Sequence, residues 1–349
     1  MQDPWREPVR GGYPDPRLLE QRGIEQLGEM LSGRTPQPPI SRLTGMRLVE
    51  VAHGTASFEL PLTDWLRSPQ GAISIGPLVM PADAAMACAI QTLLPPRTPF
   101  STSELTMRLL APARPGTLVR VQGRAIQVRQ QLALAEGSLV DEQERLIAHG
   151  STLCLMQPDA DVPKPAGAFR HPENGHGLPD PWQRPAAGAV LPQAVWDERT
   201  GIEILRAQLA GELPSPPIHH LIGIKLTVAE EGRAKFAMPA SEWLCAPART
   251  RVQGGAVALL AESALSAAIQ TRLPAGAALA PIDLKVNYLR PLRADGREAS
   301  ASGEVIHTGR RVAVASATVF DADGRKVAVA TGSAMVLAGR PASLGAAEA

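Results

Sequence analysis

The feature that most constrains the fold is an internal repeat. Gly23-Ile24-Glu25 recurs as Gly201-Ile202-Glu203, at an offset of 178 residues (201 − 23). The same offset relates Pro38-Pro39-Ile40 to Pro216-Pro217-Ile218 and continues through Gly45/Gly223, Gly54/Gly232, Phe58/Phe236, Pro61/Pro239 and Trp65/Trp243. It grows by one at Ile90-Gln91-Thr92 and Ile269-Gln270-Thr271, and again by Asp141 and Asp321. Matches in one order with so little drift predict two diverged copies of one fold unit.

The repeat divides the chain into five segments. We expect an N-terminal tail (1–16), a first domain (17–156), a linker (157–197), a second domain (198–338) and a C-terminal tail (339–349). The linker is crowded with Pro, Gly and Ala and shows no clear period, and it is long enough to cross the face of a domain. A chain of 349 residues has room for two domains of ordinary size.

Both copies have the same predicted order of elements. An amphipathic helix comes first (17–31 and 198–209), and an alternating strand and a Trp-containing loop follow it. Next comes a helix over residues 76–94 and 256–273, which in the second copy is Ala-rich and apolar almost all round. Strands at 282–288, 297–307, 311–320 and 326–337 close the second copy. One buried helix against consecutive antiparallel strands predicts an α+β fold, with the sheet curled around the helix.

Composition excludes several classes of function. A net charge of +1 gives no field that favours nucleic acid or an anionic membrane as a partner. No apolar run is long enough for a membrane span, and the start of the chain lacks the pattern of a signal peptide. Three cysteines without a CxxC pair favour reduced thiols and a cytoplasmic location. The histidines have no metal-ligand spacing, and nucleophile elbows, phosphate loops and dinucleotide fingerprints are missing, so we expect no metal or cofactor.

The segment most able to do chemistry opens the buried helix of the second copy. Gly254 and Gly255 leave unpaired N–H groups at the positive end of this helix, which can stabilise a carbonyl oxygen that gains negative charge. Glu262 follows eight residues after Gly254, in an apolar helix. Burial of a carboxylate is costly and raises its pKa toward that of a useful base. An isolated acid of this kind is often only ion-paired, but an acid recurs in the first copy, as Asp83, which favours a function.

These residues resemble a known family. The glycine pair, the helical acid, the strand Asp283–Pro291, the following Gly309-Arg310-Arg311 and the Asp321-Ala322-Asp323-Gly324 turn are similar to hotdog acyl-CoA thioesterases of the phenylacetate-pathway type. The resemblance covers most of the second copy and, more weakly, the first, and it implies a tandem double hotdog. It further implies an acyl-CoA substrate, an oxyanion site at the helix-start glycines, an Asp or Glu that acts as base or nucleophile, and a homo-oligomer.

Ser266, one turn after Glu262, is where the family often has a hydroxyl that helps the attacking water. The family's usual His before the glycines is Gln253 here, and the remaining candidate substrate-binding residues are Gly76, Asn287, Arg310 and Arg311.

Helix geometry predicts sites shared between the copies. Eight helical residues span about 12 Å, so a glycine N–H and the acid of one helix cannot easily serve the same carbonyl. Antiparallel helices side by side would bring Asp83 to Gly254-Gly255, and Glu262 to Ile75-Gly76. The resemblance implies this arrangement, because the family assembles its sites across a dimer and a fused double domain would do so internally. Pro77 has no N–H to donate, so the second pairing looks impaired. We therefore expect Asp83, rather than Glu262, to carry most of the activity.

Two other functions remain open at this point. The missing glycine pair in the first copy favours a non-catalytic acyl-CoA-binding or assembly module. A hotdog hydratase or dehydratase is the third alternative, although that chemistry usually needs a His paired with an acid and neither central helix contains a His. Within the hydrolase interpretation, the sequence does not separate activation of water by the carboxylate from direct attack by the carboxylate.

Overall fold

The computed structural model describes residues 3–157, 177–246 and 250–339. Both copies fold into the same series of elements. The first contains α1 (Gly23–Leu31), α2 (Pro39–Thr44), β1 (Arg47–Ala52), β2 (Thr55–Pro61), α3 (Ile75–Gln91), β3 (Phe100–Leu109), β4 (Leu118–Val128), β5 (Leu132–Val140) and β6 (Leu146–Met156). The second contains α4 (Gln193–Glu198), α5 (Gly201–Leu209), α6 (Pro217–Ile222), β7 (Lys225–Glu230), β8 (Arg233–Pro239), α7 (Gly254–Gln270), β9 (Ala277–Tyr288), β10 (Glu298–Thr308), β11 (Val312–Phe320) and β12 (Lys326–Ala338). The predicted C-terminal tail beyond residue 339 and part of the predicted linker, 158–176, lie outside the described residues.

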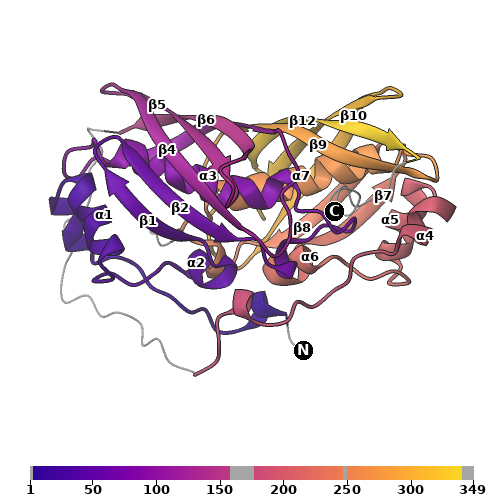
Figure 1. Cartoon of the computed structure of the whole chain (residues 1–349), viewed down its shortest axis with the longest axis horizontal. Helices are drawn as coiled ribbons and strands as arrows, with labels where there is room; N and C mark the ends of the chain where they lie inside the picture. The colour runs from indigo at the N-terminus through magenta and orange to yellow at the C-terminus, as the bar shows by residue number, and fades with distance from the viewer. Residues whose placement is uncertain (1–2, 158–176, 247–249, 340–349) are drawn as a thin grey trace.

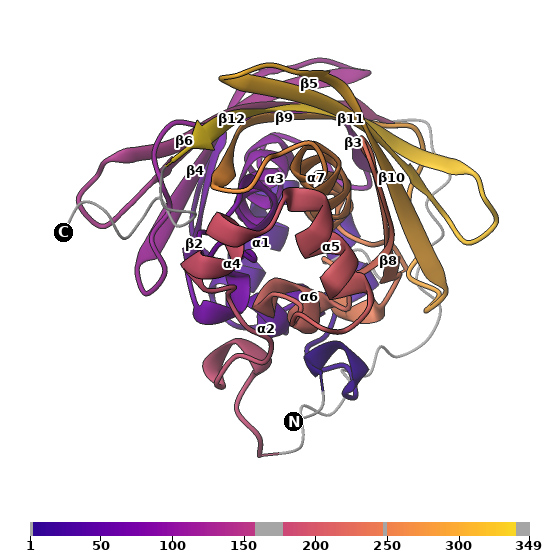
Figure 2. The ribbon, with the colours of Figure 1, turned by 90° about the vertical axis from the view of Figure 1, so that its right-hand side faces the viewer.

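The strands form one curved antiparallel sheet of twelve strands, in the order β1-β2-β4-β5-β6-β3-β9-β12-β11-β10-β8-β7. The two halves meet where β3 pairs with β9, with Leu105 opposite Val286. The predicted edge-to-edge joining of the two sheets is therefore confirmed. Figure 1 shows the first copy on the left and the second on the right under a shared sheet, and Figure 2 shows the sheet arching over α3 and α7.

The central helices α3 and α7 lie side by side (Figure 2). Their contacts show that they run antiparallel, as predicted. Gly76 near the start of α3 contacts Leu259, whereas Met80, one turn later, contacts Gly255 at the start of α7. Both helices are apolar on nearly every side because they are covered by the sheet and by each other. The smallest residues occur where the backbones come closest. A Cβ on Gly123 of β4 or Gly303 of β10 would clash with the carbonyl of Ala85 or Ala264, so glycine is required at both positions.

The repeat extends further than the sequence comparison found, because each copy begins with a segment that crosses to the other domain. Asp3-Pro4-Trp5 and Asp180-Pro181-Trp182 are counterparts, and they open the 3-10 helices η1 (Pro4–Arg6) and η4 (Pro181–Gln183). Trp5 covers Gly223 of the second domain, and Trp182 covers Gly45 of the first. The indole of Trp243 donates to the carbonyl of Glu7 (3.0 Å), as that of Trp65 does to Arg184 (2.8 Å). Residues expected in a tail and a linker thus hold the two domains together.

The two crossing segments also contact each other. The guanidinium of Arg184 forms an ion pair with the carboxylate of Glu7 (2.8 Å), with both side chains largely buried. In the described ranges, no helix has the length and apolar character needed to cross a membrane.

Candidate functional site

Gly254 and Gly255 are the first two residues of α7, which begins two positions earlier than predicted. A Cβ on Gly255 would lie 2.5 Å from the Cα of Met80, so this glycine lets α7 approach the backbone of α3. A Cβ on Gly254 would lie 2.9 Å from Oδ2 of Asp83, so this glycine leaves room for a carboxylate at the helix start. The N–H groups of both residues precede the first intrahelical hydrogen bond, so they are available to partners outside the helix.

Asp83 of α3 reaches this helix start from the other domain. Its Oδ2 accepts a hydrogen bond from the N–H of Gly255 (3.2 Å), and its Oδ1 accepts one from the hydroxyl of Thr102 on β3 (3.0 Å). The predicted pairing of Asp83 with the glycines of the opposite copy is thus present in the structure. We call this group, with Gln253, the Asp83 site.

The environment of Asp83 favours a proton acceptor that works near neutral pH. Burial raises the pKa of its carboxyl to about 6, while the hydrogen bonds from Thr102 and Gly255 act in the opposite direction. The same buried region contains the thiols of Cys88 and Cys154, whose pKa values burial raises to about 12, with Asp83 adding to the shift. The thiols are therefore neutral, and Asp83 is the group here that titrates near pH 6.

Gln253 and Tyr288 complete the polar surroundings of the Asp83 site. The Nε2 of Gln253 donates to the carbonyl of Met80 (2.7 Å), which fixes the amide, while its Oε1 is buried and has no protein partner. The hydroxyl of Tyr288 donates to the carbonyl of Gly254 (2.9 Å). Because a buried acceptor without a partner is costly, the free Oε1 marks a place for a donor such as water. Gly254 and Tyr288 are only half-buried, so the helix start is not sealed from solvent.

Glu262 of α7 lies at the start of α3, the pseudosymmetric position. Its Oε1 accepts a hydrogen bond from the hydroxyl of Ser266 (2.8 Å), and its Oε2 accepts one from the hydroxyl of Ser74 (3.3 Å). Burial raises the pKa of the carboxyl to about 7, against the effect of both serines. A Cβ on Gly76 would lie 3.0 Å from Oε2, so Gly76 permits this approach. We call this group the Glu262 site.

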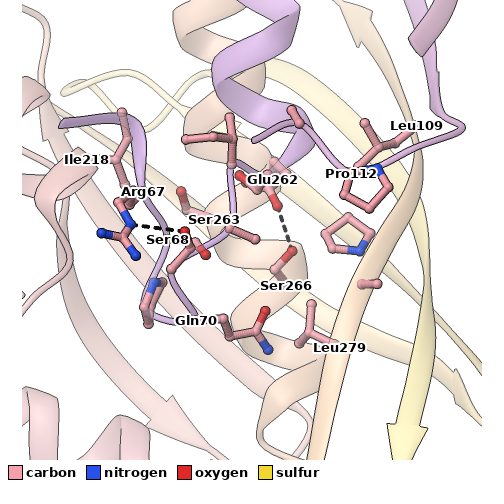
Figure 3. Close-up of a pocket in the computed structure, with 18 of the residues that line it drawn as sticks. Arg67, Ser68, Gln70, Leu109, Pro112, Ile218, Glu262, Ser263, Ser266 and Leu279 are labelled. Atoms are coloured by element: carbon pink, nitrogen blue, oxygen red, sulfur yellow. Dashed lines mark hydrogen bonds between the residues drawn. The ribbon is translucent and has the colours of Figure 1, made fainter. Parts of the chain in front are cut away.

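A cavity of about 820 Å³, partly open to solvent, reaches the Glu262 site. Figure 3 shows Glu262 and Ser266, joined by their hydrogen bond, on one wall, with Gln70 and Leu279 close by. The loop 67–74 and the segment 109–115 of the first domain form one side of the cavity. The second domain contributes His219, whose ring contacts Phe236 edge-on at 5.5 Å between centroids. Burial lowers the pKa of His219 to about 3, so its ring is neutral and belongs to the apolar wall.

The start of α3 differs from that of α7 in ways that weaken it as an oxyanion site. Ile75 occupies the position of Gly254, and its side chain is fully buried. Pro77, the third residue of α3, has no N–H. Ser74, which precedes the helix, directs its hydroxyl to Glu262 and makes no side-chain capping bond.

Three of the residues proposed from the sequence are not brought to either acid. Asn287 is exposed on β9, where the neighbouring Val286 is buried, so its side chain lies on the outer face of the sheet. Arg310 and Arg311 lie in the turn between β10 and β11. Conversely, Thr102, Tyr288 and Ser74 were not identified from the sequence, because their counterparts in the other copy are Pro281, Leu109 and Gln253, and a repeat comparison therefore gives no signal for them.

Comparison with protein families relates both copies of the repeat to thioesterases. Residues 251–328 match the thioesterase superfamily, and residues 26–156 match a family described as the acyl-CoA thioesterase C-terminal domain. Each copy of the repeat thus matches a thioesterase family over part of the chain. A curated protein of Halobacterium salinarum, provisionally named an esterase, is 34% identical over 102 residues, which are 28% of this chain and 66% of that protein. The chain thus covers slightly less than two thirds of the length of this relative.

Solved structures share the fold across both domains. A protein with the hotdog fold from Alicyclobacillus acidocaldarius is 11% identical, with a TM-score of 0.53, and the match covers 86% of this chain and 98% of that one. An acyl-CoA thioesterase II from Mycobacterium marinum is also 11% identical, with a TM-score of 0.51 and coverage of 85% and 97%. The predicted α+β fold of two tandem hotdog domains is confirmed.

Proposed function

We propose that this protein hydrolyses acyl-CoA thioesters at the Asp83 site, and that its second domain is of the phenylacetate-pathway type. The observation that carries the proposal is the hydrogen bond from the N–H of Gly255 to Asp83. It places a carboxylate from one domain beside the start of a buried helix from the other, where the two glycines allow the close approach of α3 and of Asp83. The superfamily matches supply the substrate class.

The residues of the Asp83 site have complementary roles in this reaction. A water molecule donates one hydrogen bond to the carboxylate of Asp83 and the other to the unpartnered Oε1 of Gln253, which aligns its lone pair with the carbonyl carbon. The N–H of Gly254, which precedes the first intrahelical hydrogen bond, stabilises the negative charge that develops on the carbonyl oxygen, while the N–H of Gly255 holds Asp83. As the C–O bond forms, the proton of the water passes to Asp83, and it leaves with the thiol when the C–S bond breaks. Direct attack by Asp83, with hydrolysis of the resulting anhydride, uses the same groups.

The test compares the two acids. Asp83→Asn keeps the shape of the side chain but removes the base, so thioester hydrolysis should fall by about 10²–10⁴-fold. Glu262→Gln is the matched control and should retain hydrolysis within about threefold, because its helix start has lost Gly and an N–H. The measurement is release of free thiol from a panel of acyl-CoA substrates, with melting temperatures to show that both variants are folded. A dead Glu262→Gln beside an active Asp83→Asn would reverse the assignment, and two active variants would favour a non-catalytic binding module.

A further inference from the structure

The cavity at Glu262 has no role in the reaction proposed for Asp83, yet it is built like a ligand site. Its volume, about 820 Å³, lies within the range of roughly 300–1,000 Å³ that small-molecule sites occupy. One part of its wall is apolar and comes from the second domain, namely Leu205, Ile218, Phe236, Leu279 and Leu337. Apolar walls with a few convergent polar groups are typical of sites that hold a hydrophobic ligand by one polar end.

The polar groups of the cavity are concentrated along one face of α7. Glu262, Ser263, Ser266 and Gln270 follow one another at helical spacing and all line the cavity. The hydroxyl of Ser266 and the carboxyl of Glu262 are already hydrogen-bonded to each other. The hydroxyl of Ser263 donates to the carbonyl of Leu259, whereas the buried Nε2 of Gln270 has no protein partner. A carbonyl group at the head of an apolar chain fits this arrangement, since the chain lies against the leucines and the amide of Gln270 can donate to the carbonyl.

Two arginines of the first domain complete the lining. Arg67 is half-buried, donates to the carbonyl of Gly71 (3.0 Å) and lies 3.4 Å from the carboxylate of Asp64. Arg114 is exposed in the turn between β3 and β4. Guanidinium groups recognise phosphate well, so this side of the cavity suits the phosphates of coenzyme A rather than a bare fatty acid.

We propose that the Glu262 cavity is a second acyl-CoA-binding site, which holds the acyl chain of a thioester without hydrolysing it. The identity of the ligand rests on the function proposed above. The lack of hydrolysis follows from the start of α3, where Ile75 fills the place of Gly254 and Pro77 removes a donor. Each chain should therefore bind two acyl-CoA molecules and turn over one.

The test titrates the full-length wild-type chain with S-decyl-coenzyme A, a thioether that cannot be hydrolysed, by isothermal calorimetry. We expect two equivalents per chain. Leu337→Trp should fill the cavity and leave one equivalent, with kcat/KM for decanoyl-CoA within about twofold of wild type. Ala267→Leu adds less volume at another wall position and should weaken the second binding event if the tryptophan variant fails to fold. Gln157→Trp is the matched control, because Gln157 is the repeat counterpart of Leu337 and does not line the cavity.

Several results would overturn the proposal. They are a single equivalent on wild type, two equivalents that survive in Leu337→Trp, or loss of hydrolysis together with the second equivalent in that variant. Binding of decanoate in place of the thioether would contradict the coenzyme A assignment. Because the titration reads binding alone, a wild-type chain that binds two equivalents but hydrolyses no thioester would refute the proposed function and support the second site.

Discussion

The Asp83 site and the Glu262 site occupy equivalent places in the fold but have diverged in opposite respects. The Asp83 site keeps two glycines at the helix start and gains Thr102 and Tyr288. The Glu262 site has Ile75 in place of Gly254 and Pro281 in place of Thr102, and it has the large cavity. Each site takes its acid from one copy and its helix start from the other. A substitution at the helix start of one copy therefore changes the site whose acid belongs to the other copy.

This comparison predicts a large effect when the Asp83 site is given the helix start of the other site. Gly254→Ile should reduce hydrolysis by about 10²–10³-fold, because a side chain beside Asp83 Oδ2 displaces the carbonyl from its donors. Ile75→Ala at the equivalent position should leave kcat within about threefold, at a cost in stability of about 2–5 kcal/mol. Steady-state kinetics with circular dichroism as the folding control decides the matter. Equal losses in both variants would mean that both helix starts serve catalysis.

A second prediction concerns stability, where the two sites should behave alike. The folded-state pKa of Glu262 is raised to about 7 from a usual value of 4.5, so the folded protein holds this proton more tightly than the unfolded chain. Stability from this group is thus fully present below about pH 4.5 and is lost as the pH rises to about 7. Glu262→Gln removes this loss. Relative to wild type, the variant should therefore be about 2–4 kcal/mol more stable at pH 8 than it is at pH 4.

Denaturant unfolding at the two pH values measures this difference. Asp83→Asn should show the same sign, since burial also raises the pKa of Asp83, to about 6. Both acids then cost stability at pH 8, but only Asp83 should be required for turnover. A Glu262→Gln variant whose relative stability does not change with pH would show that Glu262 is not desolvated in the folded protein.

The smallest expected effect is a shift in the pH profile. A base with a pKa of about 6 must be ionised, so kcat/KM should fall as the pH drops through about 6. Thr102→Val removes a hydrogen bond to the ionised carboxylate and should move this acidic limb upward by roughly one pH unit. Ser266→Ala, which removes the corresponding bond to Glu262, should leave the limb in place. A limb that moves with Ser266→Ala instead would assign the titration to Glu262.

The sequence by itself determined the architecture of this protein. The 178-residue offset required two copies, and the apolar, Ala-rich segment around Glu262 required a buried helix, because such a surface is stable only when covered. The strands of the second copy were located to within a few residues, apart from the earlier start of β9, because alternation and turn residues are local signals. Helix length, fixed by residue count, argued against a glycine N–H and an acid of the same helix sharing one carbonyl, and the family resemblance then implied the pairing across copies.

The tertiary structure alone decided what surrounds each acid. Thr102 and Tyr288 reach the Asp83 site from strands, and register and curvature place them there rather than any spacing along the chain. Asn287 was proposed from the sequence as a substrate-binding residue, but its side chain lies on the outer face of the sheet. Which face a strand residue occupies depends on the register, because a shift of one residue moves a side chain to the opposite face. The cavity at Glu262 likewise has walls from both domains, so its volume depends on how the domains meet. Local patterns fix which elements form, whereas the contacts between distant elements fix where a substrate can enter.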